Sequence, residues 1–102
     1  MDKADILNFL QGEWFTLDKS IHFEINDEKV FSLNKKSITH FYYELLFEEK
    51  LNKWYLNIPE LGVHGFIDSD SHNTNLVIND YYKTSFEGIL QISHTFEFFK
   101  RI

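Results

Sequence analysis

The residues of this chain best suited to chemistry are its histidines and acidic side chains, since it contains no cysteine. The five histidines are His22, His40, His64, His72 and His94. None of them forms an HxH pair, an HxxxH pair or a His-Glu pair at the spacing of a known metal site. His22 and His40 fall on the polar faces of alternating segments. The sequence therefore predicts surface histidines and no metal site.

The acidic residues form the second group. The segment Asp68-Ser69-Asp70-Ser71-His72-Asn73 begins like a calcium-binding loop, but His72 replaces an oxygen ligand and Asn73 replaces the turn glycine. Glu44 and the pair Glu48-Glu49 are expected to be solvated, as charges near a turn usually are. The chain also has no Ser or Cys nucleophile motif and no Gly-rich phosphate loop. We therefore predict a protein that is not an enzyme and that uses no cofactor.

Aromatic side chains are the main feature that favours binding, and they make up 18% of the chain. We expect five residues to wall a pocket for a small apolar or aromatic ligand, namely Phe23, Phe41, Tyr43, Trp54 and Phe96. A buried phenol seeks a hydrogen-bond partner, so Tyr43 would orient the ligand. The alternative is that these side chains simply fill the interior of the fold, and the sequence leaves both interpretations open.

The charge of the chain limits its partners. Its formal net charge is −6, and Arg101 is its single arginine. Such acidity disfavours nucleic-acid phosphates and anionic lipids, and it is compatible with a basic protein partner. No apolar run approaches the roughly 18 residues that span a bilayer, and Met1-Asp2-Lys3-Ala4-Asp5 lacks the features of a secretory signal. We expect a cytoplasmic protein that binds neither nucleic acid nor membrane.

The first element that must position these residues is a helix over about residues 2–11. Asp2 can cap its N-terminus, and Gly12 is expected to end it. Its apolar residues fall largely on one face, and they are Ile6, Leu7, Phe9 and Leu10. A helix of about ten residues is too short to be stable alone. We therefore expect it to dock, with the open end of a barrel as the natural place.

The rest of the chain predicts short strands. Alternation of apolar and polar residues is clearest at Ile21, Phe23 and Ile25. Further strands are expected over residues 13–17, 30–33, 38–47, 53–58, 61–67, 76–78, 86–93 and 95–102, with irregular stretches at 68–75 and 79–85. This pattern predicts one all-β domain over residues 1–102. We expect an antiparallel up-and-down β-barrel of about eight strands with a short N-terminal helix.

The segment Gly12-Glu13-Trp14 follows Phe9-Leu10-Gln11 and resembles the Gly-x-Trp signature of the lipocalin-like (calycin) β-barrels. In that family the tryptophan packs across the closed end of the barrel, and an arginine late in the last strand lies over its indole. Arg101 is the residue that matches this arginine. Asn79-Asp80-Tyr81 looks like the family's Thr-Asp-Tyr turn. The resemblance implies that Gly12, Trp14 and Arg101 are a structural signature and that the barrel binds a ligand.

Two functions follow as expectations. The first is non-enzymatic binding of a small apolar or aromatic molecule by a lipocalin-like barrel. The alternative is an acidic protein-binding module, such as an immunity or inhibitor protein that neutralises a basic toxin or nuclease. Its acidic turns would steer association, and they contain Asp27-Glu28, Glu48-Glu49, Asp68 and Asp70. An open cavity with converging polar groups favours the first function, and a filled barrel favours the second.

Overall fold

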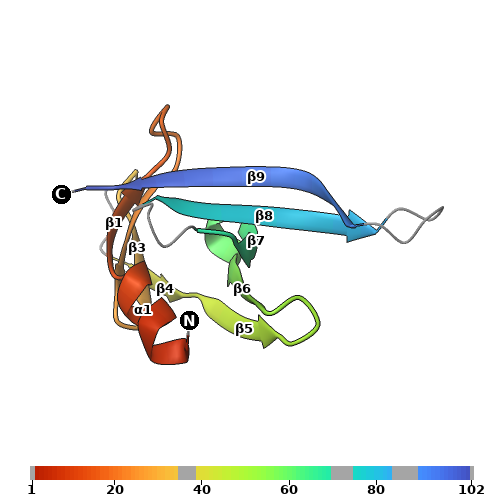
Figure 1. The fold of residues 1–102 in the computed structure, drawn as a ribbon. Helices are drawn as coiled ribbons and strands as arrows, with labels where there is room; N and C mark the ends of the chain where they lie inside the picture. The colour runs from red at the N-terminus through yellow and green to blue at the C-terminus, as the bar shows by residue number, and fades with distance from the viewer. Residues whose placement is uncertain (1, 35–38, 70–74, 84–89, 102) are drawn as a thin grey trace.

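The computed structural model describes residues 2–34, 39–69, 75–83 and 90–101 (Figure 1). Its elements are α1 (Lys3–Leu10), β1 (Gly12–Phe15), β2 (His22–Asn26), β3 (Lys29–Ser32), β4 (His40–Tyr42), β5 (Glu44–Glu48), β6 (Lys53–Ile58), the 3-10 turn η1 (Pro59–Leu61), β7 (Val63–Ile67), β8 (Leu76–Lys83) and β9 (Leu90–Lys100). The strand order is β4-β3-β2-β1-β9-β8-β7-β6-β5, and the pairing is antiparallel. The predicted all-β class is confirmed, as a nearly closed barrel of nine strands. No helix within the described ranges is long and apolar enough to cross a membrane.

The helix α1 forms where the sequence predicts it, and it is shorter by one residue at each end. The side chain of Asp2 accepts a hydrogen bond from the Asp5 amide at 2.8 Å, which caps the first turn. Ile6 and Leu10 are buried and attach the helix to the barrel. Gln11, in extended backbone, ends the helix, and Gly12 begins β1.

The core of the barrel is filled by large side chains. Trp14, Phe23 and Phe98 are completely buried, and the rings of Phe23 and Phe98 meet edge to face with centroids 5.1 Å apart. Each such residue contributes roughly 1.5–3 kcal/mol through burial. Leu33, the last residue of the strand predicted over residues 30–33, lies beyond the end of β3 and is 40% exposed.

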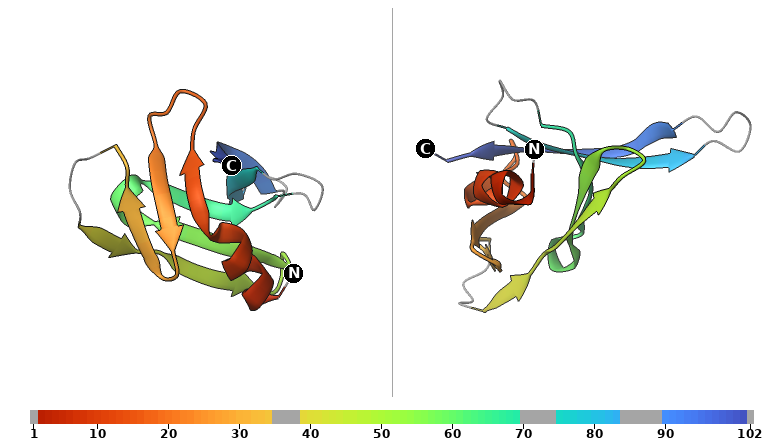
Figure 2. Two further views of the ribbon diagram at one scale, coloured as in Figure 1. Left: turned by 90° about the vertical axis from the view of Figure 1, so that its left-hand side faces the viewer. Right: turned by 60° about the horizontal axis from the view of Figure 1, so that its bottom comes forward.

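The strand predicted over residues 38–47 is divided at Tyr43. β4 precedes this residue and pairs with β3, whereas β5 follows it and pairs with β6. Two consecutive strands therefore lie at opposite ends of the strand order, which leaves the barrel nearly closed. Figure 2 shows β5 at the margin of the sheet. Within the part of the chain that the structure describes, no strand pairs with its outer edge.

The last two strands are longer than predicted. Residues 79–83 were expected to be irregular, but they continue β8 to Lys83, because β9 supplies hydrogen bonds along the whole segment. The predicted break between residues 93 and 95 is also wrong. Asp80 pairs with His94 and Tyr81 with Ile92, so one residue of β9 forms a bulge. The far end of this hairpin projects beyond the other strands (Figure 1).

Gly65 marks a close approach between β7 and β8. Its φ of +148° belongs to a region that favours glycine, and a Cβ at this position would lie 2.7 Å from the carbonyl oxygen of Asn79. The absence of a side chain thus lets the two backbones come together. Residues 70–74 of the calcium-like segment and residues 86–89 of a predicted strand lie outside the described ranges.

Candidate functional site

A groove of about 880 Å³ lies among the described residues, beside the point where the barrel fails to close. One wall is formed by Lys3 and Leu7, on one face of α1, and by Gln11, which directly follows the helix. The opposite wall is the bent segment that contains Tyr42, Tyr43 and Leu45. The turn between β2 and β3, at residues 26–29, closes one end. Apolar, polar and charged side chains therefore all contribute to the lining of the groove.

Asp27 fixes the relative positions of these walls through its backbone. The amide of Asp27 donates to Gln11 Oε1 at 2.7 Å, and its carbonyl oxygen accepts from Gln11 Nε2 at 3.3 Å. The same carbonyl accepts from the Tyr43 hydroxyl at 3.0 Å. Gln11 Nε2 also donates to the Leu7 carbonyl at 3.1 Å. The helix, the turn and the bent strand are thus joined at one residue, which makes the groove a preformed feature.

The charges around the groove are mixed. Lys3 and Lys29 carry positive charge, and Asp27 and Glu28 carry negative charge. Burial raises the pKa of Tyr43 above its ordinary value, and the carboxylates of Glu28 and Asp27 raise it further. Tyr43 is consequently a neutral hydrogen-bond donor at physiological pH.

The five residues predicted to wall a pocket all belong to the buried core or pack against it, but they do not line one opening. Only Tyr43 lines the groove. Phe23 is fully buried, and Phe41 and Phe96 pack beside the same core. Trp54 lines a separate cavity of about 140 Å³. Of the five side chains, Phe23 is the one that is completely buried and fills the interior of the barrel.

Sequence reasoning missed Leu7 and Gln11 as groove residues. Leu7 was assigned to the apolar face of the helix, and it is partly buried where that face meets the groove. Gln11 had no signal of its own, because its role depends on a turn that lies 16 residues further along the chain. Only the assembled fold brings these two segments into contact.

The covering of Trp14 differs from the family pattern. Trp14 is fully buried, and its indole nitrogen donates to the Leu10 carbonyl at 2.8 Å. Lys100, and not Arg101, lies over the indole, with its ammonium 5.3 Å from the ring centroid. The expectation that Arg101 stacks there is wrong. Alternation along β9 explains the difference, because Lys100 is the direct partner of Trp14 and residue 101 projects to the other face. A Cβ at Gly12 would lie 2.9 Å from the Lys100 side chain, so this glycine leaves space for the lysine.

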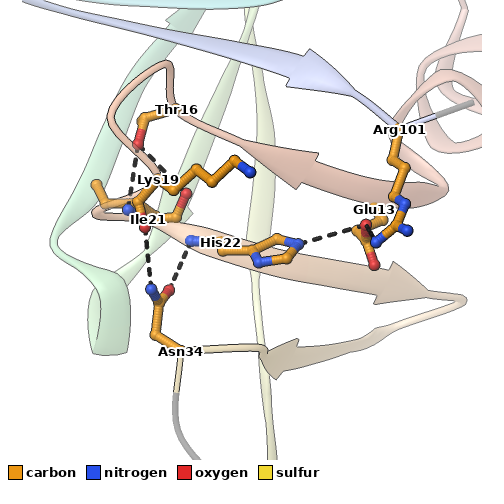
Figure 3. Close-up of polar contacts among 7 residues, drawn as sticks. All are labelled: Glu13, Thr16, Lys19, Ile21, His22, Asn34 and Arg101. Atoms are coloured by element: carbon orange, nitrogen blue, oxygen red, sulfur yellow. Dashed lines mark hydrogen bonds and ion pairs between the residues drawn. The ribbon is translucent and has the colours of Figure 1, made fainter.

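Arg101 instead joins a polar cluster on the outside of the barrel (Figure 3). Its Nη1 lies 3.2 Å from Glu13 Oε2, and His22 Nε2 lies 3.3 Å from the same oxygen. Burial raises the pKa of Glu13, but the hydrogen bonds and charges of His22 and Arg101 outweigh it and lower the pKa overall. Asn34 holds the neighbouring turn, since its side chain accepts from the His22 amide at 2.7 Å and donates to the Lys19 carbonyl at 3.1 Å. The cluster stabilises the pairing of β1 with β9.

A second polar network joins β6, β8 and β9 through Asp68, which follows the end of β7. Lys53 and Tyr81 both hydrogen-bond the carboxylate of Asp68, and Asn79 Nδ2 donates to it at 2.7 Å. Thr95 donates to the other end of the Asn79 amide at 2.7 Å. Burial raises the pKa of Asp68, but these three donors lower it below its ordinary value. Burial and the Asp68 carboxylate raise the pKa of Tyr81 to about 12. Tyr81 lies within β8, so the expected Thr-Asp-Tyr-like turn is wrong.

A cluster of Tyr55, His64 and Asp80 has limited chemical capacity. The Tyr55 hydroxyl lies 3.4 Å from His64 Nδ1, and Asp80 Oδ2 lies 3.5 Å from the same nitrogen. Both neighbours approach the same ring nitrogen, so His64 does not bridge them through its two nitrogens. Within the described ranges, no group of three His, Asp or Glu residues is placed to hold a metal ion.

Comparisons with models of known protein families, with curated proteins and with solved structures yield no match. The lipocalin-like resemblance therefore stands on the Gly12-Glu13-Trp14 segment and on a fold that is compatible with it. The structure itself establishes a nearly closed antiparallel β-barrel.

Proposed function

We propose that the chain is a non-enzymatic binding domain that takes a small amphipathic molecule in the groove beside α1. The observation that carries this proposal is a preformed opening of about 880 Å³ that lies outside the filled core of the barrel. A filled barrel alone favours the protein-binding alternative, and it is this separate groove that favours a small molecule. Small-molecule sites usually measure about 300–1,000 Å³ and combine apolar walls with a few polar groups. The groove has both features, and the barrel core is occupied by side chains such as Trp14 and Phe98.

The lining indicates the kind of ligand. Leu7, Phe31 and Leu45 offer contact to an apolar body. Lys3 and Lys29 lie beside the acidic turn, so a charged or zwitterionic end would find a partner at the rim. The proposed ligand is thus a small molecule with an apolar or aromatic body and a charged end.

The test uses anilinonaphthalene sulfonate, a probe with an aromatic body and an anionic end. Wild-type protein should bind it with one-to-one stoichiometry, and Leu7→Trp, which fills the groove, should weaken binding by roughly ten-fold or more. Leu17→Trp is the matched control, because Leu17 is 83% exposed and does not line the groove. Equal affinity of the two variants would exclude the groove as the site. Native mass spectrometry of protein purified from its own host would then identify any ligand that co-purifies.

A further inference from the structure

We propose that the free edge of β5 binds an extended, basic segment of another protein by adding it as a strand to the sheet. The preferred segment carries an apolar residue with Lys or Arg two positions before and two positions after it. This inference concerns a protein partner and does not depend on the small molecule proposed for the groove.

The first argument is the unpaired edge. β5 pairs with β6 on one side, and none of the described residues forms a strand on its other side. Along such an edge, alternate residues direct their N–H and C=O groups outward, where another strand can pair with them. The groove reaches β5 at Leu45, so open space adjoins the beginning of this edge. An added strand would therefore find unpaired backbone groups along β5, with open space beside Leu45.

The second argument is an apolar row that ends at this edge. Leu46, Tyr55 and Phe66 are cross-strand partners on β5, β6 and β7. The rings of Tyr55 and Phe66 lie 5.1 Å apart. Leu46 ends the row and is 61% exposed. An apolar residue on an added strand would extend the row by one position and cover Leu46.

The third argument is charge. Glu44 and Glu48 flank Leu46 on the same face of β5, at a spacing of two residues on either side. Lys53 pairs across from Glu48, but its ammonium is bound to Asp68. Neither glutamate is in an ion pair with another described residue. Basic residues on the added strand would lie directly opposite both carboxylates, which fixes the pattern of the partner segment.

The same charges argue against a second copy of this chain as the occupant. An antiparallel pair of β5 strands centred on Leu46 would place Glu44 of each copy opposite Glu48 of the other. Like charges that face each other directly across two strands are destabilising. A basic segment is thus the better complement.

The experiment measures binding of the peptide Thr-Lys-Thr-Leu-Thr-Lys-Thr, blocked at both ends, to ¹⁵N-labelled protein by NMR. The pattern reads the same in either chain direction, so it suits parallel and antiparallel pairing. We expect chemical-shift changes and slowed amide exchange at Glu44–Glu48. The double variant Glu44→Lys with Glu48→Lys should weaken binding by roughly ten-fold or more. The control Glu60→Lys with Glu97→Lys changes the net charge equally at two exposed sites elsewhere and should bind like wild type.

A fully N-methylated peptide keeps the side chains but cannot donate backbone hydrogen bonds, so we expect it not to bind. This comparison needs only the wild-type protein. Equal binding of the two peptides would overturn strand addition, and so would equal binding by the two charge variants. Shift changes confined to Lys3, Leu7 and Gln11 would assign the peptide to the groove and would also overturn the inference. Leu7→Trp changes the groove and not β5, so its effect on probe binding does not alter the peptide experiment. Each proposal can therefore be refuted without refuting the other.

Discussion

Substitution of Gly65 tests whether β7 and β8 approach as closely as the structure shows. An alanine Cβ at this position would lie 2.7 Å from the Asn79 carbonyl oxygen and 2.8 Å from its carbon. Both atoms belong to backbone that is held in the β8 ladder, so they cannot move without breaking strand pairing. Gly62 provides a matched control, because its φ of +67° is also left-handed but a Cβ there would meet nothing within 4 Å.

The magnitudes follow from these two environments. Gly62→Ala should lower the free energy of unfolding by about 1 kcal/mol, from the left-handed backbone alone. Gly65→Ala adds steric overlap, worth about 1–3 kcal/mol, to a backbone strain of about 1–3 kcal/mol. We therefore expect a loss of about 2–6 kcal/mol. For a chain of this length, each kcal/mol corresponds to a melting temperature shift of about 4–8 °C.

Urea unfolding followed by tryptophan fluorescence measures both variants, and calorimetry gives their melting temperatures. The Gly65→Ala variant should unfold at a clearly lower urea concentration than Gly62→Ala, with a similar slope. A difference of less than about 1 kcal/mol between the variants would refute the reasoning. It would mean that β7 and β8 are further apart than described.

Three further predictions concern charged and ionisable groups. Lys100→Ala should lower the free energy of unfolding by about 1 kcal/mol, because Lys100 covers Trp14. Arg101→Ala should lower it less, because the ion pair of Arg101 is exposed. The reverse order of the two variants in urea unfolding would contradict this. Asp68→Asn should destabilise the protein at neutral pH, and the difference from wild type should shrink as pH falls below about 4, because the folded pKa of Asp68 is lowered. A difference independent of pH would rule out that role. Ultraviolet titration should give Tyr81 a pKa of about 12. The neutral phenol of Tyr81 therefore stabilises the folded protein below pH about 10, and this contribution is lost as pH rises through 12. A pKa near 10 would show that the phenol is not hydrogen-bonded to Asp68.

The sequence predicts the fold well because local patterns determine most of it. Asp2 caps the helix as expected, and Pro59 ends β6. Period-two alternation locates β2 through Phe23 and Ile25, both of which are buried. These features depend on neighbouring residues alone, so a linear pattern is enough to identify them.

Other features could not be predicted, because they depend on which strands become neighbours. Tyr43 divides a segment that alternates without interruption, and the division follows from a change of partner from β3 to β6. Alternation likewise could not tell whether residue 100 or residue 101 faces Trp14, since the pairing register decides it. The groove depends on contact between Gln11 and Asp27, which has no signature in either segment.

The pairing of β1 with β9 has a consequence for how the protein folds. Arg101 and Glu13 are 88 residues apart, so β1 joins β9 through one of the most distant contacts among the described residues. Folds dominated by such non-local pairing typically fold in milliseconds to seconds. At a synthesis rate of about 5–20 residues per second, roughly 4–18 s pass between the synthesis of β1 and that of β9, its second partner strand. The edge of β1 is exposed to other chains during that interval, and expression conditions that slow translation would lengthen it.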